Sequence, residues 1–261
     1  MPDSIFAREG DLFRPTEAAL SPWSQEALHG GPPTMLLARE IERFPAEQAM
    51  FVARLTIELM RPVGMVPLAV KARLLRPGRK IQLVEASLWN GQVEVARATA
   101  VRIRETAVSV PHDDEPPPHG PPESVVDPAV PSYRGGPAYH RLGVEVRIPT
   151  GLLGRLGPCW GWFRLKLPVV PGEEPSGLQR ICAAADFPNG ISNVVEPERM
   201  MYINPDLTVY VHRLPVDEWV YVDARTWLEP HGIGFAEGAL YDRRGRLGRS
   251  LQSLLVEPRP D

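Results

Sequence analysis

Three segments in the first half of the chain carry the β-branched and aromatic residues that favour extended strands. They run from Val66 to Leu75, from Ile81 to Trp89 and from Val93 to Ile103. The breaks between them are Arg76-Pro77-Gly78 and Asn90-Gly91, and Asn-Gly is a strong signal for a tight hairpin turn. This pattern predicts an antiparallel meander of strands.

The second half of the chain repeats this pattern without a gap. A shift of 152 residues sets Thr208 to Pro215 on Thr56 to Val63. The same shift sets Ile233 to Tyr241 on Ile81 to Trp89, and a matching break falls at Glu229 to Gly232. A constant offset across several strand-like segments indicates two copies of one structural unit.

One helical pattern precedes each meander. The first follows Pro32 and Pro33 and runs from Thr34 to Phe44, where apolar side chains form an almost continuous surface. The second runs from Gly177 to Asp186, with Ser176 as its predicted N-cap. Each half is therefore predicted to be an apolar helix wrapped by an antiparallel sheet.

Proline is concentrated between the two units. Nine prolines lie from Pro111 to Pro137, so regular strand or helix pairing is difficult to sustain there. We predict an N-terminal unit at residues 1–108, a Pro-rich linker at 109–137 and a C-terminal unit at 138–261. Because Pro-rich chain is semi-rigid and extended, the linker is expected to carry the backbone across the face of a finished unit.

Composition and charge narrow the class of protein. The 261 residues are 43% hydrophobic and carry a net charge of −3, which fits a soluble globular protein and supplies no basic excess for nucleic acid. Cys159 and Cys182 form no CxxC pair and the six histidines are scattered, so we expect no metal site. The sequence shows neither a secretory signal nor a run approaching the roughly 18 apolar residues of a membrane helix, so we expect a cytoplasmic protein that does not bind membranes.

Known catalytic motifs are missing from the sequence. It contains no GxSxG, HExxH, GxxxxGK[ST] or GxGxxG pattern. Serine-type hydrolysis, zinc proteolysis and nucleotide cofactors therefore have no support from the sequence.

Five segments carry a resemblance to a known family. They are LHGGPPTMLLAREIER (Leu28 to Arg43), AAADFPNGISN (Ala183 to Asn193), INPDLTVYVHRLP (Ile203 to Pro215), EWVYVDARTW (Glu218 to Trp227) and GRSLQSLLVEP (Gly248 to Pro258). They resemble the TesB-type acyl-CoA thioesterases. The resemblance implies an α+β double hotdog fold, with two antiparallel sheets each wrapped around a central helix. It also implies an acyl-CoA substrate and no separate cofactor, because CoA is part of the substrate.

The resemblance further implies three catalytic residues. In that family an Asp, a Thr and a Gln on neighbouring strands hold and activate the water that attacks the thioester. The matching positions are Asp206, which would accept the proton of the water, and Thr226 and Gln252, which would orient it. Thr226 lies on the apolar face of its strand, so we expect a buried hydroxyl that bonds to Gln252 or Asp206.

The internal repeat supports this assignment independently of the family. The positions 152 residues before the three candidates are Arg54, Leu74 and Ala100. The first unit therefore keeps the strand pattern and lacks all three polar groups. The chemistry is predicted to belong to the second unit.

His29, Gly30 and Gly31 are the candidates for substrate binding and for an oxyanion hole. Glycines let a backbone approach a ligand closely, and the start of a helix favours negative charge. In hotdog enzymes the site lies between two units, so the resemblance implies that the first helix serves the polar groups of the second unit.

Two functions remain open from the sequence. The leading one is hydrolysis of acyl-CoA thioesters, and the alternative is a non-catalytic module of the same fold that binds or senses acyl-CoA. A dehydratase would need a hydratase-type motif beside an Asp or His, which the sequence lacks. Because sheet edges favour association, we also expect a homo-oligomer, a dimer or higher.

Overall fold

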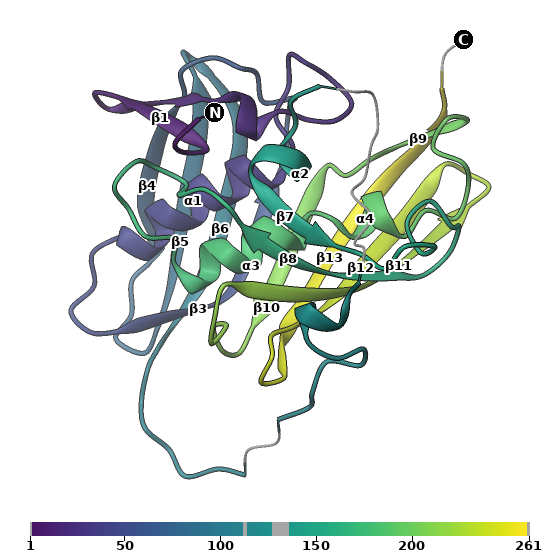
Figure 1. Cartoon of the computed structure of the whole chain (residues 1–261). Coiled ribbons are helices and arrows are strands. Elements are labelled where there is room, and N and C mark those ends of the chain that lie inside the picture. Colours follow the sequence, from purple (N-terminus) through teal and green to yellow (C-terminus); the bar gives the residue numbers. More distant parts are fainter. Residues whose placement is uncertain (1, 112–113, 127–135, 260–261) are drawn as a thin grey trace.

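The structure is a computed structural model that describes residues 2–111, 114–126 and 136–259. Within these residues the strands form one 11-stranded antiparallel sheet and a separate two-stranded hairpin. The two longest helices, α1 and α3, lie against each other at the centre of the molecule (Figure 1). The predicted double hotdog architecture is confirmed.

The first unit supplies one long helix and most of one half of the sheet. Its elements are β1 (Phe6–Glu9), β2 (Leu12–Pro15), the 3-10 turn Glu17–Ala19, α1 (Gly31–Arg43), β3 (Met50–Glu58), β4 (Ala69–Arg76), β5 (Ile81–Asn90) and β6 (Val93–Arg104). The strands β1 and β2 form the separate hairpin.

The second unit contains more strands and an additional short helix. Its elements are α2 (Tyr139–Leu142), β7 (Val144–Arg147), β8 (Cys159–Leu165), α3 (Gly177–Ala185), α4 (Pro188–Ile191), β9 (Met200–Ile203), β10 (Asp206–Val211), β11 (Trp219–Glu229), β12 (Ile233–Tyr241) and β13 (Arg246–Pro258). The sheet order is β4-β5-β6-β3-β10-β13-β12-β11-β8-β7, with β9 also pairing β13. The sheet ends at the edge strands β4 and β7. The expected association through such edges into a homo-oligomer stays a prediction.

The pairing of β3 with β10 joins the two units into one sheet. Thr56 lies opposite Thr208, with the two hydroxyl oxygens 3.2 Å apart, and these residues are 152 positions apart in sequence. An antiparallel pair that matches equivalent residues places a pseudo-two-fold axis between them. Strands β12 and β13 also repeat the register of β5 and β6 at this offset, including a bulge after Leu88 and after Leu240. The strand register therefore confirms the gapless repeat.

The two central helices form for different local reasons. Helix α1 begins at Gly31, three residues before the predicted start, because Pro32 and Pro33 fit the first turn, where a missing N–H breaks no helical hydrogen bond. Most of α1 is buried, as the apolar pattern predicts. Helix α3 begins at Gly177 as predicted, and the side chains of Ser176 and Gln179 cap its first turn reciprocally.

Part of the predicted linker packs across the outer face of the second unit's sheet. The ring of His119 stacks on Trp160 with centroids 4.3 Å apart, and its Nδ1 lies 2.6 Å from the Tyr221 hydroxyl. The indole N–H of Trp162 donates to the carbonyl oxygen of Gly120, and Val125 is buried beside these rings. Residues 114–126 thus belong to the packed structure, whereas 112–113 and 127–135 of the predicted linker lie outside the described residues.

None of the helices in the described parts of the chain is long and apolar enough to cross a membrane.

Candidate active site

The structure does not bring Asp206 together with Gln252. Asp206 opens β10, and its neighbour Leu207 is fully buried on the side that faces the helices. Because successive residues of a strand face opposite sides, the Asp206 side chain lies on the outer side of the sheet. Its Oδ1 accepts a hydrogen bond from the Ser253 backbone N–H (2.9 Å). Gln252 is fully buried on the inner side, so the expected contact between the two side chains is not formed.

Thr226 is buried as predicted, but its hydroxyl bonds to Ser192 and not to Gln252 or Asp206. Its Oγ1 lies 2.8 Å from Oγ of Ser192, which donates its own proton to the carbonyl oxygen of Pro188 (2.8 Å). The Thr226 hydroxyl is therefore the donor to Ser192. Thr226 and Gln252 share one row of the sheet with Ala236 between them, about 10 Å apart at the usual strand spacing. Thr226 ties β11 to α4 and does not bond to Gln252.

Gln252 contacts a carboxylate that the sequence did not single out. Its Nε2 donates to Oδ1 of Asp186 (3.1 Å), and its Oε1 accepts from the backbone N–H of Asn189 (3.3 Å). Asp186 is the residue that follows the last turn of α3. The amide NH₂ of Gln252 carries a second donor N–H besides the one that Asp186 accepts.

Asp186 is the centre of a polar cluster formed by both units. Its Oδ1 also accepts from Nδ2 of Asn204 (2.9 Å), and its Oδ2 lies 2.9 Å from Nδ1 of His29. We call Asp186, Gln252, Asn204 and His29 the Asp186 cluster. The Asp186 side chain is only 5% exposed, so its charge depends on these partners, since an unpaired buried carboxylate costs several kcal/mol.

The start of α1 packs directly on the carboxylate. A Cβ atom added to Gly30 would lie 2.5 Å from Oδ2 of Asp186, so only glycine fits this approach. The Gly31 N–H points at Nδ1 of His29 (3.2 Å), and the two prolines that follow have no N–H. The residue that precedes these positions is Gly30, the N-cap of α1. The structure thus brings His29, Gly30 and Gly31 to the second unit, but to Asp186 instead of Asp206.

Two aromatic rings enclose the imidazole of His29. The rings of Tyr139 and Phe187 each lie 5.0 Å from it, centroid to centroid. The Tyr139 hydroxyl donates to the carbonyl oxygen of Ala183 (3.1 Å). Burial raises the pKa of Tyr139 well above its usual value, and the negative charge of Asp186 raises this pKa further. Tyr139 therefore stays neutral beside the imidazole.

One feature of the sequence could have indicated Asp186 as a site residue, and almost none could have indicated Asn204. A negative charge at the C-terminal end of a helix opposes the helix dipole, so an Asp after the apolar helix 177–185 requires donors from elsewhere. Asn204 stands two residues before Asp206 with nothing but its side-chain type to mark it. Contacts between residues this distant in sequence follow from the fold and not from local pattern.

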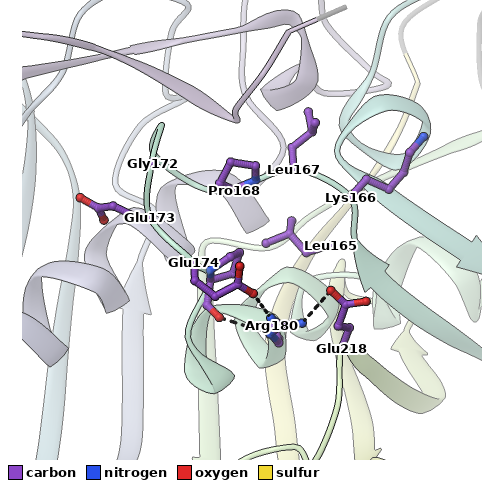
Figure 2. A pocket seen from close by; sticks show the side chains of 10 residues that line it. Leu165, Lys166, Leu167, Pro168, Gly172, Glu173, Glu174, Arg180 and Glu218 are labelled. Carbon is purple, nitrogen blue, oxygen red and sulfur yellow. Dashed lines mark hydrogen bonds and ion pairs between the residues drawn. The ribbon is translucent and has the colours of Figure 1, made fainter.

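A separate pocket lies at the opposite end of α3 (Figure 2). Arg180, in the first turn of α3, lines it together with Lys166. The guanidinium of Arg180 is paired with the carboxylates of Glu174 and Glu218. Because these carboxylates offset its charge, the pocket does not identify a site for the phosphates of CoA.

Family models match both halves of the chain. A model described as acyl-CoA thioesterase C-terminal domain matches residues 111–256, which is more than half of the chain. A model described as acyl-CoA thioesterase N-terminal domain matches residues 19–103. No curated protein matches the chain.

Solved structures share the fold over almost the whole chain. A putative thioesterase II from Thermobifida fusca YX has a TM-score of 0.75 at 17% identity, covering 98% of this chain and 96% of that one. A protein of unknown function with a hot dog fold from Alicyclobacillus acidocaldarius has a TM-score of 0.74 at 19% identity, covering 99% and 97%. The acyl-CoA thioesterase II TesB2 from Mycobacterium marinum has a TM-score of 0.68 at 18% identity, covering 96% and 94%.

Proposed function

Since this chain belongs to the acyl-CoA thioesterase family, we propose that it hydrolyses acyl-CoA thioesters to a free acid and CoA at the Asp186 cluster. One observation carries this location. A buried carboxylate of the second unit accepts hydrogen bonds from Gln252 and Asn204 directly beside the start of α1 from the first unit. A negative group that draws a proton and a donor that stabilises an oxyanion are the two groups that thioester hydrolysis requires.

Each group of the site has one task in this proposal. The charge of Asp186 drives removal of a proton from the attacking water, and the second N–H of Gln252 orients that water. The carbonyl oxygen of the thioester gains negative charge as the water oxygen adds to carbon. The Gly30 amide and the positive end of the α1 dipole stabilise that charge.

Asp206 and Thr226 receive different tasks from those that the family resemblance implies. The base role passes from Asp206 to the Asp186 cluster, because Asp206 lies on the opposite side of the sheet from Gln252. Thr226 acts on the site indirectly. Its hydroxyl bonds to Ser192 at the end of α4, and the backbone N–H of Asn189 in α4 donates to the side chain of Gln252. The assignment of Asp206 is tested by the Asp206→Asn variant described in the Discussion.

Acyl-CoA is the proposed substrate class, and a binding module remains the alternative function. The cluster favours catalysis, because a module that only holds acyl-CoA gains nothing from a desolvated carboxylate that needs three side-chain partners. The test is an assay of free thiol release across acyl-CoA substrates of increasing chain length. We expect turnover above background with at least one chain length. Measurable binding without turnover at any length would support the binding module instead.

A further inference from the structure

We propose that the imidazole of His29 takes the proton from the attacking water, and that Asp186 orients this imidazole and offsets its charge. The inference rests on the proposed thioesterase function and deepens it, because it names the atom that moves the proton. It makes His29 and Asp186 an acid–base dyad that spans the two units. His29 precedes α1 of the first unit, and Asp186 follows α3 of the second.

The surroundings of the Asp186 carboxylate make it a poor direct base. Its Oδ1 already accepts two N–H groups, from Gln252 and Asn204. Its Oδ2 lies against His29 and beneath the backbone of Gly30. The protein itself thus occupies most positions from which a water would approach the carboxylate oxygens.

The contact between Asp186 and His29 sets the position of the imidazole proton. Nδ1 lies 2.9 Å from Oδ2, and without a proton between them the lone pairs of these two atoms would repel. The Gly31 N–H approaches the same nitrogen at the longer distance of 3.2 Å. In a buried site the charge of the carboxylate outweighs that dipole, so it favours a proton on Nδ1. The neutral imidazole then keeps its lone pair on Nε2, which is the form of a general base.

The rings around His29 hold the imidazole in this orientation. Tyr139 and Phe187 pack against it, so it cannot turn freely, and its side chain is 12% exposed. Among the described residues, the titratable groups that face it are Asp186 from the end of α3 and Tyr139 from α2. Tyr139 stays neutral because burial raises its pKa well above the usual value.

The step balances without any further reactant. Nε2 of His29 accepts one proton of the water while the water oxygen bonds to the thioester carbon, and the π pair moves to the carbonyl oxygen. When that pair returns, the carbon–sulfur bond breaks and its electrons leave with the CoA sulfur. The sulfur takes the proton from the imidazolium. The products are the free acid and CoA, and His29 regains its neutral form.

The test compares His29→Ala with His231→Ala in the full chain. His231 is an exposed residue of the turn between β11 and β12, so it provides a matched loss of imidazole outside the site. We expect His29→Ala to lower kcat/KM by about 10²- to 10⁴-fold, the usual contribution of a general base. We expect His231→Ala to keep the wild-type rate and Tm. We expect His29→Ala to keep the wild-type circular dichroism spectrum with a lowered Tm, because Asp186 loses one partner, so its rate is compared per folded molecule.

Chemical rescue and pH dependence separate catalysis from a structural role. Free imidazole should restore part of the rate of His29→Ala, and the acid limb of the wild-type pH–rate profile should be lost in that variant. A His29→Ala enzyme with the wild-type rate and pH profile would overturn the inference and leave the thioesterase function intact. A slow variant without rescue and with an unchanged acid limb would overturn it as well, because the carboxylate would then act directly. A wild-type chain without turnover on any acyl-CoA refutes the proposed function instead.

Discussion

The starts of the two central helices occupy equivalent places in the pseudo-symmetric fold and are built in opposite ways. Helix α3 is capped by the side chains of Ser176 and Gln179, and Gly177 packs against apolar atoms of Leu214. Helix α1 has no side-chain cap, and Gly30 packs against the Asp186 carboxylate. The start of α3 is capped by its own side chains, and the Ser176 hydroxyl also donates to the Glu42 carboxylate, whereas the start of α1 packs uncapped against Asp186. The fold thus provides two equivalent places and equips one of them for chemistry.

The strands that pack against the helices also differ between the two units. The fully buried Gln252 of the second unit corresponds to the fully buried Ala100 of the first. Thr226 corresponds to Leu74, yet Thr226 is 4% exposed and Leu74 is 39% exposed. The side of β4 that carries Leu74 is therefore open, because β4 is an edge strand whereas β11 is flanked by β8. A repeat in sequence fixes the register of the strands but not what covers them.

The largest effect that we expect from this comparison concerns the turns at Asn90 and Asp242, which are equivalent in the repeat. Asn90 belongs to a tight turn with Gly91, whereas the Asp242 carboxylate accepts two hydrogen bonds from Arg213 (2.6 Å each) and others from backbone N–H groups. Asp242→Asn should lower the free energy of unfolding by about 3–5 kcal/mol, because it leaves a largely buried guanidinium unpaired. Urea titration measures this, with Asn90→Ala as the matched control.

The same pair predicts a difference in pH dependence. Burial on its own would raise the pKa of Asp242, but the hydrogen bonds from Arg213 and from the backbone of Val216 and Gly245 outweigh it and hold this pKa below its usual range. Asp242 therefore stabilises the fold above the usual pKa of an aspartate, and this stability is lost as the pH falls through the lowered value. Asp242→Asn should flatten the dependence of unfolding on pH in the acid range. Equal slopes for wild type and variant would refute this assignment.

The next largest effect tests the buried row of the sheet. Gln252→Ala gives the second unit the residue that the first unit has at Ala100, and it removes one donor from Asp186. We expect kcat/KM to fall by about 10²-fold, the scale for loss of one preorganised donor. Ala100→Gln is the matched reverse change. It should leave the activity of the folded enzyme unchanged and lower stability by about 1–3 kcal/mol, because it buries an amide without partners. An active Gln252→Ala enzyme would remove Gln252 from the site.

The smallest effect compares the helix starts directly. Gly30→Ala places a Cβ 2.5 Å from the Asp186 carboxylate, and Gly177→Ala places one 2.8 Å from Cβ of Leu214. We expect Gly30→Ala to lower kcat/KM by about 10-fold or more through displacement of the carboxylate. Gly177→Ala should instead lower stability by about 1–3 kcal/mol at an unchanged rate per folded molecule, because it only overpacks an apolar contact. Steady-state kinetics and thermal melts of both variants check this split. The opposite pattern would contradict the functional difference between the helices.

The fold followed from the sequence because its signals are local. The Asn90-Gly91 turn, the Ser176 cap and the constant offset each lie within a short stretch of chain, and the structure confirms all three. The site followed only in part. Gln252 and Gly30 both lie against the carboxylate of Asp186, which the sequence did not single out, and the roles of the site residues stay predictions.

The contacts of the two aspartates differ from those predicted because one residue lies at the end of a strand and the other at the end of a helix. Asp206 is one residue away from the inner face of β10, and a shift of one residue along a strand exchanges the two sides of a sheet. Asp186 lies where α3 ends, so its contacts with Asn204 and Gln252 depend on how that helix crosses the sheet. Neither fact is visible in the periodicity of the sequence.

The most direct test of the central claim compares the two aspartates. Asp186→Asn and Asp206→Asn each remove one negative charge, and only Asp186 touches Gln252. Free thiol release from an acyl-CoA that the wild type hydrolyses should be about 10³-fold slower for Asp186→Asn and within about twofold of wild type for Asp206→Asn. The reverse result, a slow Asp206→Asn and an active Asp186→Asn, would contradict the location of the site.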